Sequence, residues 1–227
     1  MTVRETSAFA AERKKPKHGT LDFYPTPAWA TEALFNIITP YNTTTGWTLC
    51  WEPACGKGHM SEVLKKHFTV MFSSDVKDYG YRTMNFVSNF ITEDRIMPRV
   101  DWIITNPPFN LAEKFILKAL DIAEYGVAIF GRIQLLETKD RYNHIYTITP
   151  PNIVAPFSSR VNLMEGELSN KSGQMMFAWF VWEKDGEDAL WNTEPPKIIW
   201  IPPRETEDPR QKKMFDKKDA ENDYNLD

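Results

Sequence analysis

Cysteines, internal repeats and long apolar runs are scarce or missing in this sequence of 227 residues. Its two cysteines, Cys50 and Cys55, are too few for a disulfide scaffold and wrongly spaced for a zinc ribbon. No segment approaches the ~18 to 20 consecutive apolar residues that cross a bilayer, and the first residues lack the apolar core of a signal peptide. We therefore expect a cytoplasmic protein with reduced thiols, and neither a membrane protein nor a solenoid.

An excess of positive charge is also missing, since the formal net charge is −4 at pH 7. Residues 1–20 carry five Lys or Arg against two acids, residues 21–203 sixteen against twenty-one, and residues 204–227 six against eight. Proteins that hold duplex nucleic acid by bulk electrostatics are usually basic. A nucleic-acid function would therefore need a local site, and the segment Arg13–Lys17 is either a basic patch or a solvated tail.

The composition is that of a folded chain, with 42% hydrophobic and 26% charged residues. The end of the chain has few apolar residues and alternating charges, which is typical of disorder. We predict a flexible basic arm over residues 1–20, one folded domain over 21–203, and a disordered charged tail over 204–227.

Strand and helix patterns alternate through the middle of the chain. A helix is predicted to begin at Thr26 and Pro27, with the Thr26 hydroxyl as its cap and Pro27 as its first residue. Further helices are predicted at 60–68 and 111–124, and strands at 47–51, 70–74, 100–105, 127–130, 153–157, 175–182 and 198–201. This order predicts an α/β fold with a doubly wound, mostly parallel sheet, whose ligands bind at the carboxyl ends of the strands.

Two of these strand ends carry residues suited to a nucleotide-like ligand. The segment Glu52–His59 contains Gly56 and Gly58, which permit positive φ and a close approach of a ligand to the backbone. It lacks the ending of a phosphate-binding P-loop and the third glycine of the dinucleotide fingerprint. Asp75 ends the next strand, where a carboxylate can accept hydrogen bonds from ribose hydroxyls or can simply serve a turn.

The third strand end is the most specific signal. Asn106-Pro107-Pro108-Phe109 places an amide and a proline carbonyl on a rigid turn, next to an aromatic ring. Two acceptors and a ring face suit a planar NH₂ group, with one hydrogen bond from each N–H and stacking on the ring that carries it. A proline-rich turn without function is the plainer interpretation.

These segments resemble the motifs of a known enzyme family. Glu52–His59 is similar to the S-adenosylmethionine loop of amino-methyltransferases, Asn106–Phe109 to their catalytic motif, and Tyr24–Pro27 to their upstream motif. From Tyr24 to Glu183 the chain resembles small phage- and prophage-type DNA adenine-N6 methyltransferases, with 75–81, 106–114 and 175–183 in the expected order. The resemblance implies a Rossmann-like class I methyltransferase fold and S-adenosylmethionine as cofactor, with no metal.

The resemblance also implies which residues hold the cofactor. They are Tyr24, Thr26, Glu52, Pro53, Ala54, Gly56, Gly58, Asp75 and Asn106. The family usually has an Asp-Phe pair whose carboxylate contacts the cofactor's adenine amino group. Asn85-Phe86 is expected at that place in this chain, and asparagine can still accept through its carbonyl oxygen.

The implied reaction is direct methyl transfer to the exocyclic N6 of adenine in DNA. Asn106 and the Pro107 carbonyl would accept from the amino group as positive charge develops on it, on a turn made rigid by Pro108. Phe109 would stack on a base that has flipped out of the duplex.

Three other functions stay open. The same tetrapeptide type serves RNA adenine methyltransferases and some protein-glutamine methyltransferases, although the aromatic residue of the latter is generally Tyr. The chain could also be a cofactor-binding subunit that needs a partner, against which the intact Asn106–Phe109 argues. The sequence does not indicate an oligomeric state.

The segment 132–172 is the only stretch left for substrate recognition. It mixes aromatic residues with Arg132, Lys139, Arg141 and Arg160, a mixture that suits phosphate contacts and base stacking. A charged helix face over 139–141 is the plainer alternative. Because the stretch is short, we expect a short or relaxed recognition sequence.

Overall fold

The computed structural model describes residues 24–38, 48–93, 100–164, 167–168, 175–184 and 189–203. The basic arm over 1–20 and the charged tail over 204–227 lie outside the described residues. Within the described ranges, no helix is long and apolar enough to cross a membrane.

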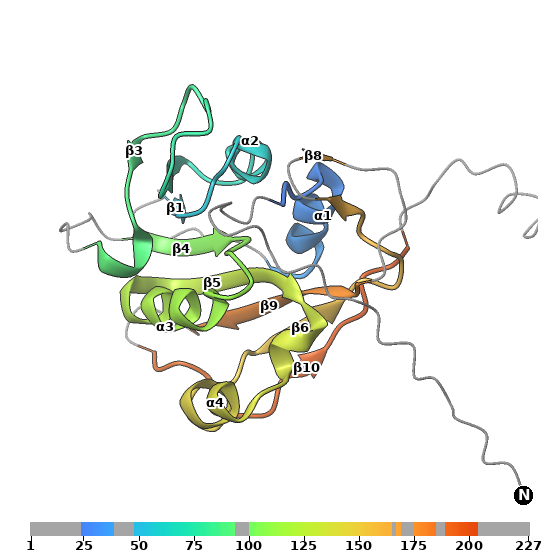
Figure 1. Cartoon of the computed structure of the whole chain (residues 1–227). Helices are drawn as coiled ribbons and strands as arrows, with labels where there is room; N and C mark the ends of the chain where they lie inside the picture. The colour runs from blue at the N-terminus through green and yellow to red at the C-terminus, as the bar shows by residue number, and fades with distance from the viewer. Residues whose placement is uncertain are drawn as a thin grey trace, which may run out of the picture.

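An eight-stranded sheet forms the centre of the fold (Figure 1). Across the sheet the strands run in the order β10 (Lys197–Ile198), β6 (Ile153–Pro156), β9 (Phe177–Glu183), β5 (Ala123–Arg132), β4 (Val100–Thr105), β1 (Leu49–Glu52), β2 (Val70–Asp75) and β3 (Phe86–Val87). All neighbours pair in parallel except β9, which is antiparallel to both β5 and β6. A separate short hairpin joins β7 (Leu163–Met164) and β8 (Glu167–Leu168).

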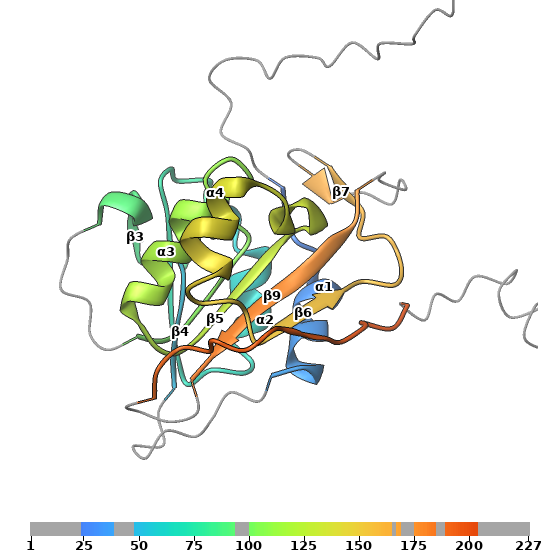
Figure 2. The same cartoon turned by 90° about the horizontal axis from the view of Figure 1, so that it is seen from below.

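Helices cover both faces of the sheet, as Figure 2 shows from below. One face carries α1 (Ala28–Glu32), the 3₁₀ turn η1 (Ala33–Asn36) and α2 (His59–Leu64). The other carries α3 (Ala112–Ile122), η3 (Ile133–Leu136), α4 (Lys139–Arg141) and η4 (Tyr142–Tyr146). A short turn, η2 (Phe90–Thr92), follows β3.

Strand β4 shows why this sheet must be covered on both sides. All six of its residues are buried. Trp102 and Ile104 belong to the core beneath α1 and α2, whereas Ile103 belongs to the core beneath α3. A strand that is apolar on both faces is typical of parallel sheets. The predicted doubly wound α/β fold is therefore confirmed.

Several predicted element boundaries differ from the structure, among them those of α1, α3 and β5. Helix α1 begins at Ala28 with Pro27 as its N-cap, and the Thr26 hydroxyl makes no capping bond. The predicted helix 111–124 ends at Ile122, because Ala123 is already extended with ψ 135°. Strand β5 consequently has ten residues where the sequence predicted 127–130.

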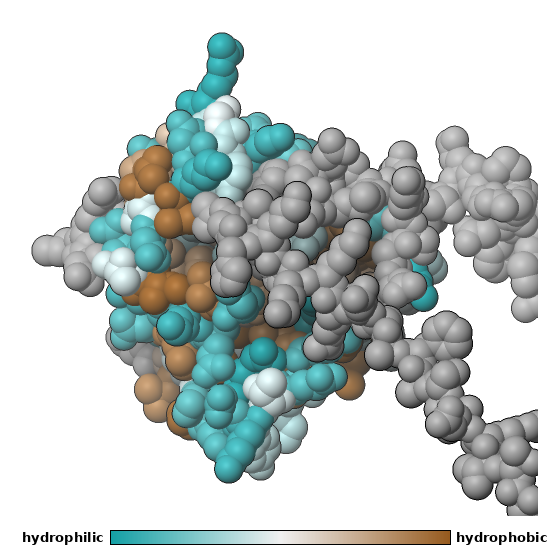
Figure 3. Space-filling model, in the orientation of Figure 1, coloured by the Kyte–Doolittle hydropathy of each residue, from teal (hydrophilic) through white to brown (hydrophobic). Residues whose placement is uncertain are grey.

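The surface of the described part is mixed, and Figure 3 shows apolar patches broken by hydrophilic side chains on the face in view. Among the exposed large apolar side chains, Ile198 and Trp200 lie in or next to the edge strand β10. They lie far along the sheet from the ends of β1 and β2.

Close packing between β4 and β5 leaves no room for a side chain at Gly126. Gly126 pairs with Trp102, and a Cβ atom there would lie 2.4 Å from the Trp102 ring. We expect Gly126→Ala to lower the free energy of unfolding by about 1 to 3 kcal/mol in urea denaturation, the usual cost of overpacking. Gly131→Ala in the same strand is the control, because its Cβ would meet Leu135 at an ordinary 3.4 Å. Equal losses in the two variants would contradict this explanation.

Candidate active site

The carboxyl ends of β1, β2 and β4 meet at one edge of the sheet, where they border a cavity of about 450 Å³. Its lining comes from the segments that follow these three strands, together with Tyr24–Thr26 and Ser88–Thr92. The predicted residues Tyr24, Thr26, Glu52, Pro53, Ala54, Asp75 and Asn106 all line it. The expectation that the ligand site lies at the strand ends thus agrees with the position of the cavity.

The loop after β1 turns sharply at its two glycines. Gly56 has φ 52° and Gly58 has φ 82°, in the left-handed region that side chains disfavour. A Cβ atom on Gly58 would lie 2.2 Å from the Tyr81 ring. Glycine at position 58 is therefore required both by the backbone and by the ring packed over it.

Glu52 is a buried acid at the start of this loop, only 2% exposed. Its carboxylate accepts a hydrogen bond from the Ser61 hydroxyl, which lies 2.7 Å from the Ser73 hydroxyl. The pKa of Glu52 is raised to about 8, chiefly by burial; the bond from Ser61 opposes this shift, and the nearby Asp75 carboxylate adds to it. At neutral pH the Glu52 carboxyl is mostly protonated, and a cation in the cavity would favour its ionised form.

Asp75 fastens the end of β2 to the glycine loop. Its Oδ2 accepts from the Gly56 N–H at 2.8 Å and its Oδ1 from the Lys77 N–H at 3.2 Å. Burial raises the pKa of Asp75, and these backbone donors oppose that shift. Each carboxylate oxygen keeps a second lone pair, so Asp75 can also accept bonds from ligand hydroxyls in the cavity it lines.

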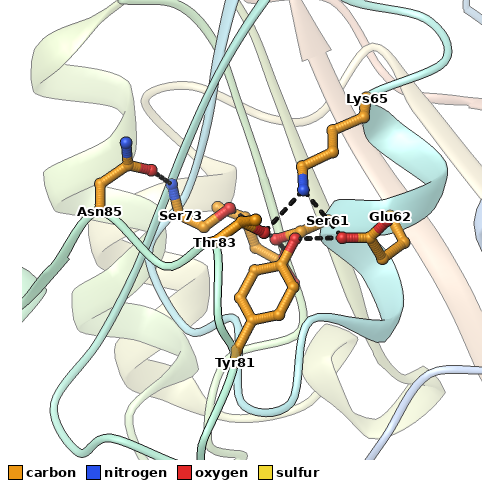
Figure 4. A network of polar contacts seen from close by, with 8 residues as sticks. Ser61, Glu62, Lys65, Ser73, Tyr81, Thr83 and Asn85 are labelled. Carbon is orange, nitrogen blue, oxygen red and sulfur yellow. Dashed lines mark hydrogen bonds and ion pairs between the residues drawn. The ribbon is translucent and has the colours of Figure 1, made fainter.

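The segment after β2 is held against α2 by a polar network (Figure 4). Glu62 accepts from the Tyr81 hydroxyl at 2.7 Å and from Lys65 Nζ at 2.8 Å, and Lys65 also donates to Thr83 Oγ1 at 2.7 Å. This network fixes Tyr81 over Gly58 and so fixes one wall of the glycine loop.

Asn85 and Phe86, expected against the cofactor, are not among the residues that line the cavity. Asn85 Oδ1 accepts from the Ser73 N–H at 2.8 Å, and the Asn85 N–H donates to the Ser73 carbonyl at 2.8 Å, as Figure 4 shows for the side chain. Both groups pair the chain with β2, so Asn85 has a role in the sheet, and its expected contact with the cofactor stays a prediction.

A second Asn-Phe pair, Asn89-Phe90, does line the cavity. Phe90 is 2% exposed and packs edge-on against Trp51 at 5.1 Å, while Asn89 Oδ1 accepts from the Ile91 N–H at 3.2 Å. The dipeptide occurs twice in the sequence, four residues apart, and the sequence alone does not distinguish the two copies. Tyr79, His59 and Lys114 are further lining residues that the sequence analysis did not assign.

Tyr24 and Thr26 fix the orientation of the Asn106 side-chain amide. Its Nδ2 donates to the Tyr24 carbonyl at 2.9 Å and to Thr26 Oγ1 at 3.0 Å. A carbonyl can only accept, so the nitrogen of the amide must point toward Tyr24. This leaves Oδ1 as the atom that Asn106 can offer to a ligand. It also explains why Thr26 does not cap α1.

Pro107 and Phe109 face a second, smaller hollow of about 160 Å³, whereas Asn106 and Pro108 line the larger cavity. The tetrapeptide is therefore shared by two adjoining spaces. The Phe109 ring lies 5.1 Å from the Tyr24 ring and 6.2 Å from the Phe177 ring, measured between centroids. The Arg132 guanidinium carbon lies closer, 3.8 Å from the centroid of the Phe109 ring.

The four basic residues expected to contact nucleic acid have different surroundings. Arg132 lies on Phe109 at the end of β5, whereas Lys139 and Arg160 are exposed. Arg141 has a structural role as well, because its Nη1 donates to the carbonyls of Gln134, Leu135 and Glu137 at 2.9, 3.1 and 2.8 Å. It also lines the smaller hollow, and its contact with nucleic acid stays a prediction.

Comparison with known proteins gives relatives by structure and none by sequence. No family model matches the chain, and no curated protein matches it. Among solved structures, a candidate RNA methyltransferase from Pyrococcus horikoshii has a TM-score of 0.52 and 16% identity, over 72% of this chain and 87% of that one. A candidate class I S-adenosylmethionine-dependent methyltransferase from Listeria monocytogenes has a TM-score of 0.52 and 14% identity, over 82% and 67%.

The modification subunit of a candidate type I restriction enzyme from Vibrio vulnificus is similar as well, with a TM-score of 0.54 and 13% identity. The match covers 82% of this chain and 48% of that subunit, so the present chain spans about half of it. At these identities the likeness concerns the fold. The chain has the Rossmann-like fold of the class I methyltransferases.

Proposed function

We propose that this protein transfers the methyl group of S-adenosylmethionine to the exocyclic N6 of adenine in DNA. The observation that carries the proposal is the fixed amide of Asn106, whose Oδ1 remains available beside the cavity because its Nδ2 is bound to Tyr24 and Thr26. An acceptor at this place, next to a proline carbonyl and an aromatic ring, suits an amino group on a planar base.

The cavity residues fit S-adenosylmethionine. Buried acids, Glu52 and Asp75, suit a ligand that carries a sulfonium and an ammonium group, and Asp75 can accept from ribose hydroxyls. Gly56 and Gly58 keep the loop beside them free of side chains, while Asn89 and Phe90 offer an amide and a ring edge to the adenine end. When bound, the cofactor supplies an electrophilic methyl group on sulfur.

The residues around Phe109 act on the other reactant. The amino nitrogen of adenine is a weak nucleophile because its lone pair is delocalised into the ring. Acceptors at Asn106 Oδ1 and the Pro107 carbonyl stabilise the positive charge that develops on that nitrogen as it attacks. Phe109 orients the base, and orientation supplies much of the rate in a transfer between two bound reactants. The proton then leaves the alkylated nitrogen to solvent.

The substrate class rests on two lines of support. The motif resemblance favours DNA, and the similar structures include both a restriction-enzyme modification subunit and a candidate RNA methyltransferase. RNA adenine methylation is therefore the second candidate. Incubation with labelled S-adenosylmethionine and DNA, RNA or protein in parallel, followed by nucleoside analysis for N6-methyl-deoxyadenosine or N6-methyladenosine, tests both.

Asn106→Ala should reduce the methyl-transfer rate by at least about 100-fold, the usual cost of removing one charge-stabilising group. Single-turnover kinetics with saturating cofactor measure this rate. The matched control is Thr26→Val, which removes one acceptor of Asn106 Nδ2 but leaves Oδ1 in place. It should change the rate only a few-fold. Equal losses in both variants would show that Asn106 acts through the Tyr24–Thr26 segment alone.

The affinity for S-adenosylmethionine should rise with pH because of Glu52. With a pKa of about 8 in the empty cavity, Glu52 must release a proton when a cation binds beside it. Calorimetric affinity should increase by about an order of magnitude between about pH 6.5 and 8.5, with proton release detectable from buffer ionisation heats. Glu52→Gln should bind more weakly and lose most of this dependence.

Glu52 also determines how the free energy of unfolding changes with pH. The pKa of Glu52 is raised from 4.5, so its burial destabilises the fold increasingly as pH rises from about 4.5 to about 8. Glu52→Gln should therefore be at least as stable as the natural chain at about pH 8.5. A variant that unfolds more easily there would contradict the assigned protonation state.

The two Asn-Phe pairs can be distinguished by matched substitutions to aspartate. Asn89→Asp should tighten cofactor binding by a few-fold, because a carboxylate is a stronger acceptor for an adenine amino group. Asn85→Asp keeps the oxygen that accepts from the Ser73 N–H and should leave the dissociation constant unchanged. Calorimetry measures both. A response at position 85 alone would restore the first assignment.

A further inference from the structure

Arg132 lies on the Phe109 ring, the surface on which the proposed function stacks the substrate base. Its guanidinium carbon lies 3.8 Å from the Phe109 ring centroid, well within the range of a cation–π contact. A base that stacks on Phe109 needs the same ring, whose other aromatic neighbours are Tyr24 and Phe177 at larger separations. The guanidinium group and the incoming base therefore compete for one surface.

The backbone that carries Arg132 is fixed, so only the side chain would have to move away from the Phe109 ring. Arg132 is half-buried at the last position of β5, and it lines the smaller hollow together with Phe109, Gly131 and Gln134. The backbone there is anchored, because β5 is paired with β9 up to Arg132 and Phe177, and the next N–H, of Ile133, donates to the Met176 carbonyl. Because the backbone is fixed there, a change in the Arg132 side-chain rotamer alone would uncover the Phe109 ring, and the sheet would keep its pairing.

The positively charged Arg132 side chain could also bind a group of the proposed substrate. A nucleotide that enters this site carries phosphates on both sides of its base, and arginine pairs with phosphate by two parallel hydrogen bonds. The neighbouring Arg141 also lines the smaller hollow, but its Nη1 already donates to three backbone carbonyls. Arg132 combines a contact with the Phe109 ring and a position beside the tetrapeptide.

We propose that Arg132 is a positioning residue that covers Phe109 in the empty enzyme and, when the target base arrives, gives up the ring and binds a phosphate of the substrate strand. This inference rests on the proposed function, since it takes Phe109 to be the stacking surface. It assigns to one side chain two opposite effects: Arg132 weakens binding of a bare base and strengthens binding of the intact strand.

The test uses two ligands that separate these effects. The first is 2-aminopurine riboside, a fluorescent nucleoside without phosphates, and the second is a labelled duplex oligonucleotide. In Arg132→Ala the nucleoside should bind about three- to tenfold more tightly, because the competing cation is gone. The duplex should bind about threefold or more weakly, with its salt dependence reduced by about one charge.

Further variants distinguish these effects from a defect in folding. Arg132→Lys retains the charge but loses the flat stacking group, so it should bind the nucleoside more tightly while keeping most of its duplex affinity. Arg160→Ala, which removes an exposed arginine, should weaken duplex binding and leave nucleoside binding unchanged. In a Phe109→Leu background, Arg132→Ala should no longer change nucleoside affinity, which gives the coupling between the two side chains.

The outcomes separate this inference from the proposed function. Weaker binding of both ligands by Arg132→Ala and Arg132→Lys would overturn it, since Arg132 would then only support the site. Absence of nucleoside binding by every variant would overturn it as well, because Phe109 would then not receive a base. If the affinities change as expected but the natural chain methylates no DNA, the inference holds and the proposed reaction fails.

Discussion

Parallel pairing of β1 with both β2 and β4 is the constraint on which the site depends. Parallel neighbours end at the same edge, so Glu52, Asp75 and Asn106 come together although they are far apart in the sequence. Burial of the sheet on both faces holds this register, because a strand such as β4 cannot shift without exposing apolar side chains. Two hydrogen bonds then fix the positions of these side chains: the Gly56 N–H donates to Asp75, and Asn106 Nδ2 donates to the Tyr24 carbonyl.

The cavity and the space around Phe109 differ in their electrostatic character. Buried carboxyl groups of Glu52 and Asp75 line the first, while the guanidinium group of Arg132 borders the second. A cationic cofactor and a polyanionic substrate would each meet the opposite charge, with the tetrapeptide between them. This arrangement is local, which agrees with an overall net charge of −4 in a protein proposed to act on nucleic acid.

Much of the fold was readable from the sequence, because it depends on patterns that act over a few residues. The apolar run of 100–105 predicted β4 with its observed bounds, and the glycines at 56 and 58 predicted positive φ. The errors arose where a residue far away in the sequence determines the local structure. Thr26 would have capped a helix in isolation, but the Asn106 amide, 80 residues away, takes its hydroxyl.

The same reason explains the site residues that were missed. Asn85 and Asn89 both precede phenylalanine, and only the pairing of Asn85 with Ser73 shows which one is used by the sheet. Arg141 resembles a solvent-facing base in the sequence, yet its Nη1 donates to the carbonyl groups of Gln134, Leu135 and Glu137. Local propensity cannot report such contacts, because they exist only after the elements have packed.

The reversed direction of β9 determines which loop can change without a change in the strands that border the cavity. Strand β6 ends at Pro156 and β9 starts at Phe177 on the same edge as the end of β5, so the connection between them leaves and returns on the side of Phe109. The strands that carry Glu52 and Asp75, β1 and β2, are not part of this connection. Exchange or enlargement of this connection would therefore change the surface beside Phe109 and leave the strands that carry Glu52 and Asp75 as they are.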